Sequence, residues 1–243
     1  MKRSLCRALL VATSAIAIAF APVESFAQGG EVPKPAVDLT PGTATYKVRL
    51  EAAGQVASAQ LTRTTKSQNR TWVVTETSTI AGQTETDETT FEKKTLILRK
   101  RLFRAGDGVA DLNFAGHKVT GTITNGRDQQ PIDRDLGVAI FADGSGGQDV
   151  LAALPLAKGY SVEFRNFNVS SLDVKSLKLW VADTETVTVP AGTFDTWKAL
   201  ITSLDGGSDT YALWVEKRTH RVVKMAISVP NMHDALITAE LIK

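Results

Sequence analysis

Apolar and polar residues alternate along most of the chain from Thr43 to its end. Tyr46, Val48 and Leu50 alternate with polar neighbours, and Trp72 and Val74 repeat the pattern. Because successive side chains of a strand point to opposite faces, this period of two indicates strands that are buried on one side. The same alternation recurs at Leu112 and Phe114, Val119 and Ile123, and Val187 and Val189.

Turn-forming residues interrupt the alternation about every ten to twelve residues, which is typical of an antiparallel meander. Asn125 and Gly126 predict a type I′ hairpin turn, because both central positions of that turn require positive φ. The other breaks fall at Ala53–Gly54, Ala81–Gly82, Gly106–Gly108, Ala115–Gly116 and Asp205–Gly207.

The stretch TVTVPAGTFDTWKAL, residues 186–200, predicts a hairpin with Pro190, Ala191 and Gly192 in a three-residue loop closed by a bulge. We expect Gly192 to supply the left-handed residue. A phosphate-binding loop would need several glycines that lead into a helix, and here one glycine leads into a strand. The loop is therefore interpreted as structural.

One helix is predicted, from Gln148 to Leu156, with Asp149 as its cap and Pro155 as its stop. Residues 28–42 are rich in Gly and Pro and predict a flexible lead-in. The expected fold is nearly all-β: a strongly curved antiparallel sheet or open half-barrel of about ten or more strands in a single domain, residues 43–243, with the short helix near 148–156.

Residues 1–27 have the pattern of a cleavable secretory signal peptide. Lys2, Arg3 and Arg7 precede the apolar run 8–21, and Ser25 and Ala27 occupy the positions that a signal peptidase reads. We expect cleavage before Gln28 and a periplasmic location. The apolar run is too short for a comfortable membrane span, so no integral membrane segment is expected.

Charge and cysteine content exclude several classes of function. Three of the 28 basic and one of the 26 acidic residues lie in 1–27, so residues 28–243 carry equal numbers of each. A nucleic-acid partner therefore has no electrostatic basis. The single cysteine, Cys6, precedes the apolar run, which leaves no thiol for catalysis, disulfides or metal binding.

Four stretches resemble one family: YKVRLEAAG at 46–54, LPLAKGY at 154–160, VPAGTFDTW at 189–197 and YALWVEKRTHRVVK at 211–224. They are similar to exported bacterial proteins grouped as domain of unknown function 3108. The resemblance implies an exported, nearly all-β protein whose curved open sheet is similar to that of periplasmic lipoprotein carriers. It carries over no catalytic residue.

No motif for catalysis or metal binding is found. Ser145 lies in ADGSGG, where Asp143 replaces the glycine that a nucleophile elbow requires. His117, His220 and His233 lack the spacing of metal ligands and are interpreted as turn or loop residues. We therefore expect no enzyme, no cofactor and no metal site.

The strand 97–104, ILRKRLFR, follows the acidic stretch ETDETTFE at 85–92. A hairpin turning near 93–95 would place Glu88 opposite Arg99 and Asp87 opposite Lys100. Two interpretations stay open. The charges either form a solvated ladder that protects a sheet edge, or Arg99, Lys100, Arg101 and Arg104 form a dock for an anionic headgroup or partner.

Trp72, Trp180, Trp197 and Trp214 each lie in a strand-like run. They fill the core, or some of them line a cavity for an acyl chain on the concave face. The function expected is non-catalytic binding of an apolar or lipid-like ligand, with these tryptophans, Arg99 and Arg101 as the candidate ligand-binding residues. The alternative is a structural or interaction module with a filled core that contacts an envelope protein.

Overall fold

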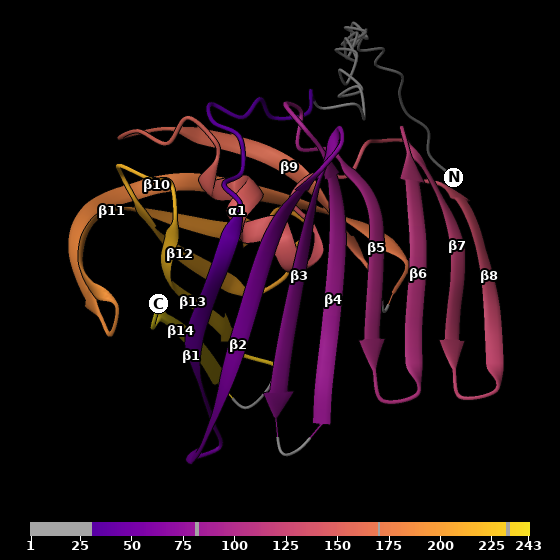
Figure 1. Cartoon of the computed structure of the whole chain (residues 1–243), viewed down its shortest axis with the longest axis horizontal. Helices are drawn as coiled ribbons and strands as arrows, with labels where there is room; N and C mark the ends of the chain where they lie inside the picture. Colours follow the sequence, from indigo (N-terminus) through magenta and orange to yellow (C-terminus); the bar gives the residue numbers. More distant parts are fainter. Residues whose placement is uncertain (1–30, 81–82, 170, 232–233) are drawn as a thin grey trace, which may run out of the picture.

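The structure is a computed structural model that describes residues 31–243 except 81–82, 170 and 232–233. The described residues form one antiparallel sheet of 14 strands (Figure 1). The strands are β1 (Gly42–Ala52), β2 (Gln55–Gln68), β3 (Thr71–Ile80), β4 (Gln83–Glu92), β5 (Leu98–Ala105), β6 (Gly108–Ala115), β7 (Lys118–Asn125), β8 (Asp128–Asp135), β9 (Ser161–Asn168), β10 (Asp173–Val189), β11 (Gly192–Ser203), β12 (Thr210–Glu216), β13 (Val222–Val229) and β14 (Ala235–Leu241).

Two meanders, β1 to β8 and β9 to β14, make up the sheet. They are joined by the pairing of β1 with β14, in which Tyr46 lies opposite Leu241. The strand order therefore runs from β8 to β1 and then from β14 to β9, with β8 and β9 as the two edges. The sheet curves strongly without closing, as Figure 1 shows. The predicted open, curved antiparallel sheet is confirmed.

The helical segment lies inside the curve of the sheet (Figure 1). A 3-10 turn, η1 (Gly144–Gly146), leads directly into α1 (Gly147–Ala152). A short helix is thus present as predicted, but the predicted bounds and N-cap were wrong. Gly146 is the N-cap, and Asp149 stands within the first turn, where its carboxylate instead binds Arg63.

The helical segment packs directly on the concave face of β3 and β4. A Cβ at Gly146 would lie 2.4 Å from the ring of Phe91, so only glycine permits this approach. The hydroxyl of Ser145 donates to the carbonyl oxygen of Val74 at 3.0 Å and lies 3.0 Å from the Thr89 hydroxyl. Ser145 is therefore buried and anchors the helical segment to the sheet.

Part of the concave face is filled by aromatic contacts between distant strands. Phe114 of β6 meets Phe167 of β9 edge to face, with ring centroids 5.6 Å apart. Phe141, in the linker after β8, meets Phe164 of β9 at 6.5 Å. The linker also donates the Phe141 amide to the Arg165 carbonyl at 2.9 Å. The edge strand β9 is thus held by packed side chains against β6 and the linker that follows β8.

Most predicted turns lie where the alternation breaks, although two differ in detail. The connection of β7 and β8 is centred on Gly126 and Arg127, and of these two residues only Gly126 has a positive φ. A type I′ turn needs a positive φ at both, so the type I′ assignment was wrong. Val189 pairs with Gly192, which makes the β10–β11 loop two residues long instead of three. Gly192 has φ +139°, so a positive φ is still required there. The predicted break at 81–82 lies outside the described residues.

Residues 31–41 form no regular structure but pack against the sheet. Leu39 is buried, and the amides of Ala36 and Val37 both donate to the carbonyl oxygen of Ala153 at the end of α1. We call residues 31–41 the strap. The buried Leu39 side chain and the two backbone hydrogen bonds to Ala153 hold the strap against the domain. The Pro- and Gly-rich composition did not indicate these contacts.

The predicted signal peptide, residues 1–27, lies outside the described residues. Within the part of the chain that the structure describes, no helix is long and apolar enough to cross a membrane.

Candidate functional site

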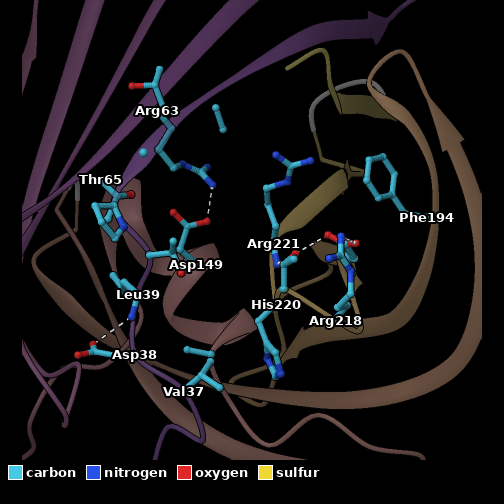
Figure 2. A pocket seen from close by; sticks show the side chains of 18 of the residues that line it. Val37, Asp38, Leu39, Arg63, Thr65, Asp149, Phe194, Arg218, His220 and Arg221 are labelled. Atoms are coloured by element: carbon cyan, nitrogen blue, oxygen red, sulfur yellow. Dashed lines mark hydrogen bonds and ion pairs between the residues drawn. The ribbon is translucent and has the colours of Figure 1, made fainter.

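The concave face keeps a cavity of about 410 Å³ between the strap, α1 and the β12–β13 hairpin. We call it the mouth cavity. Figure 2 shows Arg63, Asp149 and Leu39 on one side of it and Arg218, His220 and Phe194 on the other. Its lining comprises residues 37–44, Tyr46, Arg63, Thr65, Asp149, Ala153, Phe194, Glu216 and residues 218–221.

Arg63 of β2 forms the polar inner wall of the mouth cavity. Its side chain is 2% exposed and donates to three acceptors. Glu76 Oε2 accepts from Nε at 2.9 Å and from Nη2 at 2.7 Å, while Asp149 Oδ1 accepts from Nη1 at 3.1 Å. Gln148 Oε1 accepts a further bond from Nη2 at 3.1 Å. A guanidinium with these partners ties β2, β3 and α1 together.

Burial and charge act in opposite directions on Arg63. Burial alone would lower the pKa of Arg63, but the carboxylates of Asp149 and Glu76 outweigh it, and the pKa is raised. Arg63 also lies over the ring of Tyr46, 5.4 Å from its centroid. Burial raises the pKa of Tyr46 to about 12, and its hydroxyl donates to the Val222 carbonyl at 2.9 Å. The inner wall is therefore a charged arginine and a neutral tyrosine.

The β12–β13 hairpin forms the opposite wall and carries two further arginines. Arg218 is 84% exposed and lies 3.5 Å from Glu216, whose carboxylate also accepts from the Thr219 hydroxyl. The guanidinium of Arg221 lies over the ring of Phe194, 5.7 Å from its centroid. Among the described residues, no carboxylate lies within 4.0 Å of the Arg221 guanidinium nitrogens. Arg221 is thus a cation without an ion-pair partner there.

His220 fixes the hairpin to the end of α1. Its backbone has φ +57°, and Nδ1 lies 2.7 Å from the carbonyl oxygen of Ala152. Because a carbonyl oxygen only accepts, Nδ1 carries the hydrogen of this bond. The hairpin is therefore held at a set distance from the helix, which keeps the mouth cavity open between them.

The strap forms the third wall. Asp38 accepts a short hydrogen bond from the indole Nε1 of Trp72, and its Oδ1 also accepts from the Leu39 amide at 3.0 Å. Lys93 lies over the Trp72 ring, 5.0 Å from its centroid. These contacts place Trp72 directly behind the strap.

A smaller inner cavity of about 140 Å³ lies on the other side of α1. Its lining includes the apolar residues Leu151, Phe164, Leu213 and Met225 and the polar residue Gln148. Because Gln148 accepts from Arg63 in the wall of the mouth cavity, α1 and this hydrogen bond separate the two cavities.

The predicted basic run does not form a single basic face. Thr89 pairs with Arg101 and Thr90 with Lys100, so the predicted opposition of Glu88 to Arg99 and Asp87 to Lys100 was wrong. The connection between β4 and β5 is longer than expected, and an irregularity between Thr90 and Phe91 shifts the register. Side chains therefore alternate, with Arg101 facing inward and Lys100 outward.

Each of these arginines that was proposed for ligand binding has a carboxylate partner. Arg99 pairs with Glu92 near the surface. Arg101 donates to both oxygens of Asp87, at 3.2 and 3.0 Å, and to Asp143 Oδ2 at 3.0 Å. Burial raises the pKa of Asp143, although Arg101 acts against it. Arg101 thus holds the start of the helical segment against β4, and its role in ligand binding stays a prediction.

The four tryptophans do not gather in one place. Trp72 lies on the concave side with Val74, and Trp197 shares its strand face with Ile201, which lines the inner cavity. Trp214 alternates with Leu213 and is flanked by Lys198 and Lys224 on the convex face. Trp180 pairs with Leu200 on that same convex face. None of the four is among the residues that line the two cavities described above.

The residues that do line the mouth cavity were missed from the sequence. Arg63 carried one usable signal, because it stands between Leu61 and Thr65 at an inward position of a period-two strand. A charge at such a position must find partners. Nothing in the sequence indicated that the partners are Glu76 and Asp149, which lie 13 and 86 residues away.

Fold and site together define a class: an open, strongly curved antiparallel sheet that holds a cavity with apolar and charged walls. The family comparison specifies it further. Residues 43–234 match the family model described as protein of unknown function (DUF3108), and the chain belongs to this family. No curated protein matches it.

A solved structure shares the fold at low sequence identity, and two others are more distantly similar. A β-barrel-like protein of the domain of unknown function DUF1849 from Brucella abortus is 12% identical, with a TM-score of 0.54 over 86% of this chain and 98% of that one. The hypothetical lipoprotein YmcC from Escherichia coli is 12% identical, with a TM-score of 0.35 over 82% and 83%. The LolA superfamily protein NE2245 from Nitrosomonas europaea is 11% identical, with a TM-score of 0.22 over 87% and 86%.

Proposed function

We propose that this protein binds an amphipathic, lipid-like molecule in the mouth cavity, and that it does so in the periplasm after removal of residues 1–27. The observation that carries the proposal is the mixed lining of the cavity. Val37, Leu39 and Phe194 supply apolar surface, while Arg218 and Arg221 supply charge. A ligand that satisfies both needs an apolar part and a polar part.

The size of the mouth cavity supports this proposal. Ligand sites for small molecules occupy about 300 to 1,000 Å³. The mouth cavity, at about 410 Å³, falls within this range, whereas the inner cavity, at about 140 Å³, does not. The mouth cavity is therefore the better candidate for a whole ligand.

We further propose that the protein acts by binding and not by catalysis. The buried charged groups of the concave face pair with one another: Arg63 with Glu76 and Asp149, and Arg101 with Asp87 and Asp143. Such mutual pairing supports a structural role for these groups, because each carboxylate already has a guanidinium as its partner.

The direct test is native mass spectrometry of the protein purified from its own cell envelope, followed by extraction and identification of any copurifying molecule. We expect a bound species of lipid mass that organic solvent releases. Protein that carries no such species, and that takes up none when incubated with an envelope lipid extract, would contradict the proposal.

A second candidate function is a protein-interaction module, and one observation favours it. Trp180 and Leu200 pair across β10 and β11 on the convex face, and both are half-buried. An apolar patch on an outer face can serve as a contact surface. Crosslinking in the native envelope would distinguish the two, since a module of this kind would be captured with another protein and without lipid.

A further inference from the structure

The charges of the mouth cavity are distributed unevenly between its two ends. At the inner end, the carboxylates of Glu76 and Asp149 compensate the positive charge of Arg63. At the outer end, Arg221 has no carboxylate partner in the described part of the chain, and Arg218 is largely exposed at 3.5 Å from Glu216. Arg221 on the β12–β13 hairpin is therefore a cation of the cavity whose charge is not compensated by a described carboxylate, and Arg218 next to it is only weakly paired.

The acidic residues of the cavity are not available to a cationic ligand. Asp38 accepts from the Trp72 indole and the Leu39 amide. Asp149 accepts from Arg63, and Glu216 accepts from the side chains of Thr219 and Arg218. A cation would have to displace these bonds, whereas an anion would meet Arg221, whose guanidinium has no carboxylate partner among the described residues.

Arg221 is also held in place for such a contact. Its guanidinium rests over the Phe194 ring, and the bond between His220 and Ala152 fixes the preceding residue to α1. A guanidinium carries its N–H groups in one plane, where they match the two oxygens of a carboxylate or phosphate.

Building on the proposed function, we propose that the ligand is an anionic amphiphile. Its carboxylate or phosphate headgroup binds Arg221, with Arg218 as the second cation, at the outer end of the mouth cavity. Its apolar chain lies between the strap and Phe194, against Val37 and Leu39. This orientation leaves the Arg63 cluster as a closed inner wall that the headgroup does not contact.

Isothermal titration calorimetry on the chain from Gln28 to Lys243 tests this inference with decanoate, decyl phosphate and the neutral decanol as probes. We expect the wild type to bind both anions more tightly than decanol. Arg221→Gln should weaken anion binding by about tenfold or more, because a charge-assisted bidentate contact is lost, and leave decanol unchanged. Arg221→Lys should fall between them. Arg127→Gln, at an exposed turn, is the matched control and should bind like the wild type.

The other outcomes separate the two proposals. If neither the anions nor decanol bind, the proposed function itself fails. If decanol binds as tightly as decanoate and Arg221→Gln changes nothing, amphiphile binding stands and the anionic headgroup site is overturned. If acetate or inorganic phosphate bound as tightly as the amphiphiles, the proposed contact with the apolar chain of the ligand would be overturned, and a site for small anions would remain. If Arg99→Gln lost anion binding and Arg221→Gln kept it, the headgroup site would lie on β5 and the inference would be overturned.

Discussion

Replacing Arg63 with methionine should destabilise the protein strongly. Methionine fills a similar volume but removes the guanidinium that pairs with Glu76 and Asp149. Breaking a fully buried ion pair by removing one partner costs about 3 to 5 kcal/mol, because the other charge stays buried without compensation. Glu76 and Asp149 are 21% and 23% exposed, so water reaches them in part. We therefore expect a loss near the lower end, about 3 kcal/mol.

The loss is measured by urea unfolding followed by circular dichroism, with thermal melting as a second readout. For a chain of this size, about 3 kcal/mol corresponds to a melting temperature lower by roughly 6 to 12 °C. Arg49→Met is the matched control, since its pair with Glu51 on β1 is half exposed and should contribute no more than about 1 kcal/mol. If Arg63→Met and Arg49→Met have the same effect, the reasoning from burial is wrong.

A double-mutant cycle isolates the interaction between Arg63 and Glu76. Glu76→Gln removes one of the two carboxylates that Arg63 compensates, so Arg63→Met should cost less in that background than in the wild type. Additive effects of the two substitutions would show that the two side chains do not interact.

Three further predictions concern the turn, the buried tyrosine and the N-terminus. Gly192→Val should lower the free energy of unfolding by about 1 to 3 kcal/mol, because a β-branched residue is forced to a positive φ. Pro190→Ala should lower it less. An unchanged urea midpoint for Gly192→Val would refute the argument from the backbone conformation of Gly192. The pKa of Tyr46 is about 12 in the fold and about 10 when unfolded, so the folded state binds more protons in this window and the free energy of unfolding should fall by about 2 kcal/mol as the pH rises from 10 to 12. Tyr46→Phe should abolish this part of the pH dependence, and an identical pH dependence in that variant would contradict it. Edman sequencing of the protein from a periplasmic extract should begin at Gln28, and retention of residues 1–27 would exclude the proposed cleavage.

The sequence alone determined the class of fold, because the relevant signals are local. A strand with one buried face must alternate with period two, as Tyr46, Val48 and Leu50 do, and a tight connection needs glycine where φ is positive. These requirements act within a few residues of the chain. They therefore predicted an antiparallel sheet with one helix, and the structure confirms both.

Only the tertiary structure decided how these elements combine and where the mouth cavity lies. The pairing of β1 with β14 joins segments at opposite ends of the domain, and several neighbours for β1 would satisfy its alternation equally well. The register of β4 on β5 depended on an irregularity that shifts the pairing by whole residues, which turned Arg101 inward toward Asp143. Arg63, Asp149 and Arg221 meet around one cavity because the sheet curves around α1. Alternation states that a side chain faces one side of a strand, but the curvature of the whole sheet decides which residues share that side.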